Sequence, residues 1–151
     1  APLGECNLVT HVSQQLPIYT WSEILGIPIE DRQKLVSWME FLELAQYFTY
    51  EMIKEQNEGK TESSPDPAMV DMFNSMVDEM FDYGRFILNS KRDNPSNDLL
   101  SAIANAELEG DKLTDEFLDG SWLLIIFAGN DTTRNTLSGG IKLLHENQRQ
   151  K

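Results

Sequence analysis

The fold of this chain is decided by the stretch Trp-Leu-Leu-Ile-Ile-Phe-Ala-Gly-Asn-Asp-Thr-Thr-Arg, residues 122–134. Six consecutive apolar residues are followed by two small residues and then by an acid and two hydroxyls, which are Ala128, Gly129, Asp131, Thr132 and Thr133. Buried polar groups need partners, so polar chemistry at the centre of an apolar segment is costly unless it is used. The stretch is therefore the first candidate for a functional site.

Two secondary structures are open to this stretch. Residues 122–127 could form a buried strand, followed by a Gly-Asn-Asp turn and a helix from Thr132. Against that, residues 118–127 contain no turn signal, and no other strand of comparable strength is there to pair with it. We therefore predict one long helix, which begins after the capping residue Thr114 and carries two acids in its first turn.

Apolar residues recur at three- and four-residue spacing in two upstream segments, which predicts two more helices. The first spans Asp31 to Gln56, and the second begins at Pro67 with Asp66 as its cap and runs to about Asn89. Residues 57–66 between them are rich in Gly, Ser, Pro and charge, which predicts a mobile loop.

Three shorter elements complete the prediction. A helix from Pro17 ends at Gly26, and another from Asp98 to Glu109 buries Leu99, Leu100, Ile103 and Leu108 and ends at Gly110. Residues 6–12 form a short segment with β-branched residues that could be one edge strand or a helical turn, and we favour the edge strand. The fold class is therefore mainly α, with residues 1–151 as a single domain.

Composition excludes several classes of function. A formal net charge of −13 disfavours a nucleic acid partner. No apolar run reaches the roughly 18–20 residues that span a bilayer, so no membrane partner is expected. The first residues lack the basic and apolar regions of a signal peptide. Cys6 is the single cysteine, which excludes an intramolecular disulfide or a cysteine metal cluster and indicates a reducing, cytoplasmic location.

The residue types at 128–133 indicate chemistry without naming a reaction. Ala128 and Gly129 remove side-chain bulk, so a flat ligand or a small molecule could lie against the backbone. Thr132 can bond the carbonyl of Ala128, and Asp131 with Thr132 could pass protons inward. The alternative is that Asp131, Thr132 and Thr133 form a satisfied polar patch or a cap.

Residues 128–134, Ala-Gly-Asn-Asp-Thr-Thr-Arg, resemble the (Ala/Gly)-Gly-x-(Asp/Glu)-Thr-Thr motif in the long central helix of cytochrome P450s. Two further stretches support the resemblance. Residues 23–28, Glu-Ile-Leu-Gly-Ile-Pro, resemble the bacterial P450 sequence Glu-Leu-Leu-Gly-Val-Pro, and residues 97–101 with 113–116 resemble the approach to the central helix. The resemblance implies the central part of a P450 fold, with antiparallel helices packed on one long central helix and an incomplete domain.

The resemblance also implies roles for individual residues. Asp131 would be the acid of a proton relay, and Thr132 the hydroxyl that helps to protonate dioxygen. The residues beside the haem b cofactor would be Ala128, Gly129 and Thr133. The helices at 31–56 and 67–89 would form a lid over the substrate channel, and the contacts to substrate would be Ile126, Phe127, Met72 and Met76. Ordinary core packing is the alternative for the methionines.

The resemblance leaves the haem iron without a ligand in this chain. A P450 ligates iron through a cysteine in a glycine-rich loop beyond the central helix. Cys6 lies before the matched helices and is not assigned as a metal ligand, and His11 and His145 qualify by residue type alone.

The function implied is that of a fragment of a haem-thiolate monooxygenase, itself inactive. The complete enzyme would insert one oxygen atom from O2 into an apolar substrate such as an alkane, fatty acid, terpenoid or sterol-like molecule. Its electrons would come through a ferredoxin or flavoprotein partner. The alternative is a non-enzymatic helical scaffold that has kept these helices and forms a homo-oligomer through its exposed apolar surface.

Overall fold

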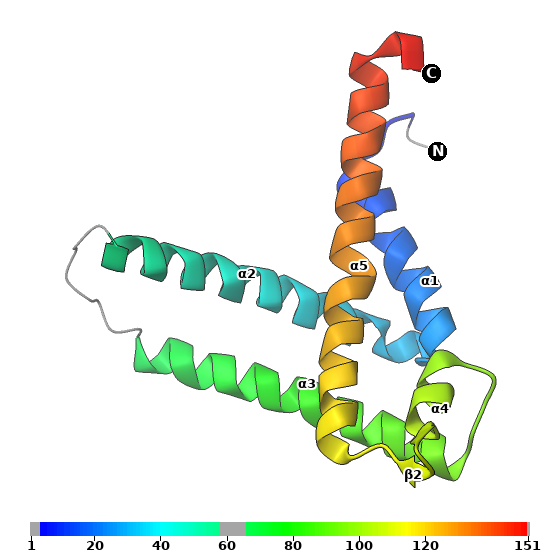
Figure 1. The fold of residues 1–151 in the computed structure, drawn as a ribbon. Helices are drawn as coiled ribbons and strands as arrows, with labels where there is room; N and C mark the ends of the chain where they lie inside the picture. The colour runs from blue at the N-terminus through cyan, green and yellow to red at the C-terminus, as the bar shows by residue number, and fades with distance from the viewer. Residues whose placement is uncertain (1–3, 58–65, 151) are drawn as a thin grey trace.

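The computed structural model describes residues 4–57 and 66–150, which are mostly helical (Figure 1). The helix α5 is the longest element, and α1 lies along one part of it while α2 and α3 extend sideways from another. The α-helices are α1 Gln15–Leu25, α2 Arg32–Asn57, α3 Pro67–Asp93, α4 Leu99–Ala104 and α5 Asp115–Glu146. The shorter elements are η1 Val9–Ser13, η2 Ile29–Asp31, η3 Gln148–Gln150, β1 Glu107–Leu108 and β2 Asp111–Lys112.

The predicted helix ends are confirmed where a capping residue defines them. The side chain of Asp66 accepts a hydrogen bond from the amide of Ala68 at the start of α3. The hydroxyl of Thr114 accepts one from the amide of Phe117 at the start of α5. Gly26 ends α1 with a φ of 68°, a left-handed conformation that glycine adopts without steric cost. The helix α5 runs from Asp115 to Glu146 without a break, so the prediction of one long helix through residues 122–127 is confirmed.

The predicted edge strand at residues 6–12 is wrong. Residues Val9–Ser13 form the π-helical turn η1, which leads directly into α1. The side-chain oxygen of Asn7 accepts hydrogen bonds from the amides of Val9 and Thr10 at 3.0 and 3.1 Å. This local cap starts a helix and outweighs the weak preference of β-branched residues for strands.

The predicted helix from Asp98 to Glu109 is too long. It ends at Ala104, where the side-chain amide of Asn105 donates to the carbonyls of Lys91 and Ser101. The strands β1 and β2 then pair antiparallel, and Leu108, which was expected to be buried, is 67% exposed. In the other direction, α3 continues past Asn89 to Asp93. Of the predicted loop at 57–66, residues 58–65 lie outside the described part of the chain.

The core lies where α2, α3 and α5 cross. Trp38, Tyr83 and Trp122 come one from each helix, and their ring centroids are 5.3 to 6.3 Å apart. Gly84 lets α3 approach α5, because a Cβ at that position would overlap the ring of Trp122. The indole N–H of Trp122 donates to the carbonyl of Met80 at 2.9 Å. This packing fixes which face of α5 is buried and leaves its other faces for a site.

Within residues 4–57 and 66–150, none of the helices combines the length and the apolar character that crossing a membrane requires.

Candidate functional site

The central part of α5 has a buried face and an open apolar face. Leu118, Trp122 and Ile126 are spaced four residues apart and are buried in the core. On the opposite face, Phe117 is 57% exposed and Leu124 is 67% exposed. We call Phe117, Leu124 and the exposed Ala128 the outer strip.

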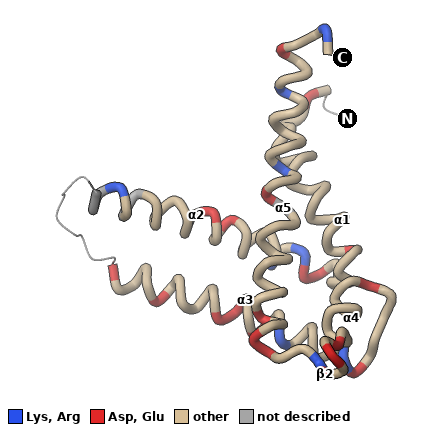
Figure 2. Tube along the Cα trace, in the orientation of Figure 1, with Lys and Arg blue, Asp and Glu red and all other residues tan. Residues whose placement is uncertain are grey.

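The outer strip carries no charge of its own. The sequence has no charged residue between Asp119 and Asp131, and Figure 2 shows this uncharged stretch along the middle of α5. Apolar surface left exposed on a helix is stabilised when another apolar group covers it. The part of the outer strip formed by Leu124 and Ala128 can therefore accept an apolar group without burying a charge.

Asp131, Thr132 and Thr133, which we call the polar turn, follow the outer strip directly. The hydroxyl of Thr132 is exposed and donates to the carbonyl of Ala128 at 3.1 Å, as the sequence predicted. The carboxylate of Asp131 is half-buried and accepts hydrogen bonds from Arg134 at 2.9 Å and from the amide of Asn135 at 2.8 Å. Thr132 and Thr133 are exposed, so the polar turn is a surface feature with a proton-bearing hydroxyl in reach of solvent.

Arg134 connects the polar turn to α2. Its guanidinium donates to Glu43 of α2 as well as to Asp131. Burial raises the pKa of Glu43, the nearby Asp131 raises it further, and the charge of Arg134 opposes both effects. Two carboxylates therefore share one guanidinium, and an acid on the expected lid helix is in electrostatic contact with the acid of the expected relay.

The small pair Ala128 and Gly129 does not present one open groove. A Cβ at Gly129 would overlap the indole of Trp21, which reaches over it from α1. The indole N–H donates to the carbonyl of Ile125 at 3.0 Å. The space beside the Gly129 backbone, where a flat ligand was expected, holds a side chain of the protein itself.

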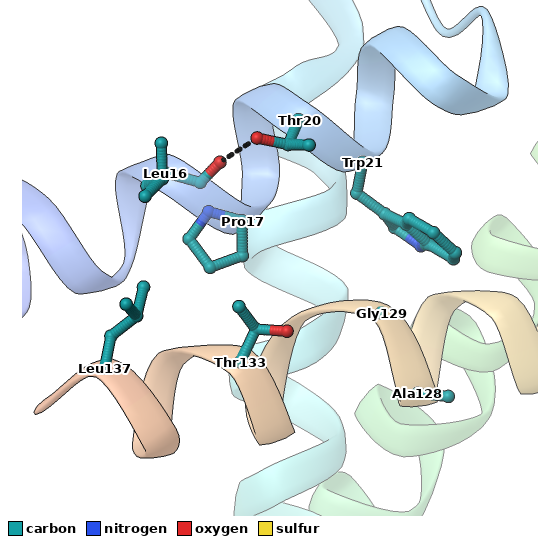
Figure 3. Close-up of a pocket in the computed structure, with 8 residues that line it drawn as sticks. All are labelled: Leu16, Pro17, Thr20, Trp21, Ala128, Gly129, Thr133 and Leu137. Atoms are coloured by element: carbon teal, nitrogen blue, oxygen red, sulfur yellow. Dashed lines mark hydrogen bonds between the residues drawn. The ribbon is translucent and has the colours of Figure 1, made fainter. Parts of the chain in front are cut away.

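An open pocket of about 400 Å³ continues from this contact between α1 and α5. Thr133 and Leu137 point from α5 toward α1, and Trp21 lies beside Gly129 (Figure 3). The lining residues are Leu16, Pro17, Thr20, Trp21, Ala128, Gly129, Thr133 and Leu137. The pocket thus brings together the three residues that were expected to contact the cofactor.

The four residues that were expected to contact substrate lie in different surroundings. Ile126 is 1% exposed and packs in the core, whereas Phe127 is 36% exposed. On α3, Met72 is 55% exposed and Met76 is half-buried against the core. Core packing therefore accounts for Met80, which is buried, and does not account for Met72.

Further apolar side chains are exposed on α2 and α3. They are Tyr47, Phe48, Tyr50 and Ile53 on α2 and Met69, Val70 and Phe73 on α3. We call these residues and Met72 the arm surface. Phe41 of α2 and Phe73 of the arm surface, with ring centroids 5.1 Å apart, join the two helices.

No group of three or more His, Cys, Asp or Glu side chains within residues 4–57 and 66–150 could hold a metal ion. Cys6 is exposed and free, and Nδ1 of His11 accepts a hydrogen bond from the amide of Asn7 at 3.1 Å.

Sequence reasoning missed Trp21, Arg134 and Glu43 as members of the site. Arg134 stands in the quoted motif, so its position carried a signal. Glu43 is 91 residues away from Arg134 in the sequence, and no pattern along the chain joins the two.

Known proteins match this chain over nearly all of its length. No protein-family model matches it. The chain is 30% identical over 143 residues to "Cytochrome P450 109" of Bacillus spizizenii, which covers 93% of this chain and 32% of that protein. It is 29% identical over 146 residues to a steroid C26-monooxygenase of Mycobacterium bovis, covering 97% of this chain and 30% of that protein. The chain thus spans about a third of the length of these relatives.

Solved structures agree with this match. A Mycobacterium marinum cytochrome P450 in complex with pseudoionone aligns with a TM-score of 0.68 at 31% identity, covering 92% of this chain and 30% of that one. A Bacillus megaterium cytochrome P450 in complex with testosterone aligns with a TM-score of 0.69 at 30% identity, covering 96% of this chain and 34% of that one.

Proposed function

We infer that this chain, a segment of a cytochrome P450, is the central part of a haem-thiolate monooxygenase. The reaction would convert an apolar substrate RH, O2, two electrons and two protons into ROH and water. One observation carries the proposal. The exposed hydroxyl of Thr132, the residue after Asp131, donates a hydrogen bond to the carbonyl of Ala128 in the outer strip.

Haem b fits the outer strip by its chemistry. Phe117, Leu124 and Ala128 offer an exposed, uncharged surface to which a flat apolar macrocycle could bind. When bound, haem iron supplies the centre at which O2 is reduced. Gly129 and Thr133 line the pocket beside α1, so their contact with the cofactor stays a prediction. The thiolate ligand would come from a part of the protein outside this chain.

The residues of the polar turn would deliver protons. Thr132 Oγ1 carries a proton that it donates to the carbonyl of Ala128, and it could turn to donate that proton to O2 as it is reduced beside Ala128. The carboxylate of Asp131 is held in place by Arg134 and Asn135 and could replace that proton from solvent. General acid assistance of this kind contributes about 10²–10⁴-fold in rate.

The substrate would be an apolar molecule of the alkane, fatty acid, terpenoid or sterol-like class. The names of two matched proteins support this class, a steroid C26-monooxygenase and a P450 in complex with testosterone. The arm surface on α2 and α3 is apolar and exposed, as a lid over such a substrate would be. Electrons would come from NAD(P)H through a ferredoxin or flavoprotein, in the cytoplasm. No observation favours the non-enzymatic scaffold, since the matched proteins are enzymes.

The proposal is tested first on the spectrum of the whole protein. With reductant and carbon monoxide, we expect the Soret band of a haem with a thiolate ligand. A protein that binds no haem, or that binds it without this band, overturns the proposal.

The second test changes Thr132→Ala, with Thr136→Ala as the matched control. Thr136 is also exposed, one turn further along α5. We expect Thr132→Ala to lower product formation about 10²-fold or more while O2 is still reduced, with hydrogen peroxide as the product. Thr136→Ala should keep the yield of the unmodified protein. Equal yields in both variants would contradict the role of Thr132.

A further inference from the structure

Trp21 adds a hydrogen-bond donor to the backbone of α5 from outside the helix. Its indole N–H lies 3.0 Å from the carbonyl oxygen of Ile125. In an α-helix the same carbonyl accepts the amide of the residue four positions later, which is Gly129. The carbonyl of Ile125 therefore serves two donors, one from α5 and one from α1.

A second carbonyl in the same turn also serves two donors. The carbonyl of Ala128 accepts the hydroxyl of Thr132 at 3.1 Å in addition to its helical partner. Side chains that enter the hydrogen-bond ladder are among the few causes of local bending in helices. The two carbonyls, of Ile125 and Ala128, lie in the helical turn directly before Asp131, so the extra donors act on the backbone that leads into the polar turn.

The indole is held firmly over Gly129. The helix α1 is anchored by two buried apolar residues near Trp21, namely Ile18 and Leu25. A Cβ at Gly129 would overlap three atoms of the indole, so the ring can pack against this position only because the residue has no side chain. The packing of Trp21 therefore explains why residue 129 is a glycine, without any contact to a ligand.

We propose that Trp21 is a positioning residue for the oxygen chemistry of α5. By holding the carbonyl of Ile125, it fixes the turn that carries Ala128, Asp131 and Thr132. The link from α1 to the backbone of α5 stands on the contacts above, and its consequence for the reaction rests on the proposed function.

The first experiment measures amide hydrogen exchange of the whole protein. The variant Trp21→Phe keeps an aromatic ring and removes the N–H donor. The matched control is Ser22→Ala, which removes a hydrogen bond from the buried Ser22 hydroxyl to Tyr19 in the same helix and leaves Trp21 in place. We expect Trp21→Phe to speed exchange at residues 125–133 about two- to tenfold, the range that one net hydrogen bond corresponds to. Ser22→Ala should not single out these residues.

The second experiment measures how much of the consumed NAD(P)H yields oxygenated product. A correctly held turn gives one ROH and one water per NAD(P)H, whereas failed proton delivery gives hydrogen peroxide from the same O2 and the same two electrons. We expect Trp21→Phe to lower the product fraction several-fold with an unchanged KM for substrate, and Ser22→Ala to leave the fraction unchanged. A purely structural role would lower the amount of folded enzyme and leave this ratio alone.

Three outcomes overturn the inference. Unchanged exchange at residues 125–133 in Trp21→Phe removes the link between α1 and the backbone of α5. Faster exchange with an unchanged product fraction reduces Trp21 to a structural residue. An unmodified protein that makes no oxygenated product overturns the proposed function and the role of Trp21 in it, while the exchange experiment still decides the link.

Discussion

At the scale of single residues, the glycines of α5 differ in whether their surroundings leave room for a side chain. Gly129 lies under Trp21, and a Cβ there would overlap the ring, whereas Gly139 has nothing within 4 Å of the position where its Cβ would be. The sequence shows both residues in the same helix with the same cost relative to alanine. Only the partner from α1 separates them, and that partner is far away in the chain.

This difference predicts opposite effects of the same substitution. Gly129→Ala should destabilise the protein by about 1–2 kcal/mol, because overpacking outweighs the gain in helix propensity. Gly139→Ala should be neutral or stabilise it by up to about 1 kcal/mol. Urea unfolding of the two variants measures this, and Gly129→Ala with Trp21→Leu should recover stability if the overlap is the cause. Two variants of equal stability would contradict the contact.

At the scale of elements, periodicity predicted the long helices and failed for the short ones. The helices α2, α3 and α5 run for 26, 27 and 32 residues, which gives an apolar pattern many turns in which to repeat. The strands β1 and β2 have two residues each, too few for any alternation to show. Similarly, the polar turn of the site could be predicted because its residues are consecutive. Trp21 and Glu43 could not be predicted as members of the site, because tertiary packing alone brings them to α5.

Asp98 joins the short helix α4 to the long helix α3. It accepts the amide of Ser101 at 2.8 Å and so caps α4, and it binds Lys91 of α3 and the hydroxyl of Ser96. Burial opposes the charge of Asp98, but these hydrogen bonds outweigh it and lower its pKa to about 2.

A lowered pKa makes the stability from Asp98 depend on acid. Because the folded pKa lies below the unfolded value of about 3.9, the contribution is present above pH 4 and is lost as the pH falls toward 2. It amounts to about 2 kcal/mol. Denaturant unfolding between pH 7 and pH 2 should therefore show a steeper loss for the unmodified protein than for Asp98→Asn. Parallel curves for the two proteins would mean that the network around Asp98 does not stabilise its charge.

At the scale of the whole molecule, α5 is packed on one side and open on the other. The crossing with α2 and α3 buries Trp122 and Ile126, and α1 covers Gly129, while the outer strip is exposed. The helical packing therefore leaves exposed the uncharged face that precedes the polar turn. Both the proposed cofactor and the proposed proton donor are assigned to this one face.

A charge placed in the outer strip should therefore weaken haem binding. Burying an unpaired carboxylate costs several kcal/mol, which corresponds to at least a tenfold loss of affinity for the group that covers it. We expect the whole protein with Leu124→Asp to be purified with much less haem per chain, measured by the ratio of Soret to protein absorbance. Ile29→Asp is the control, because Ile29 is 71% exposed and lies between α1 and α2, away from the outer strip. Equal haem content in the two variants would show that the outer strip does not contact the cofactor, even if the protein proves to be a monooxygenase.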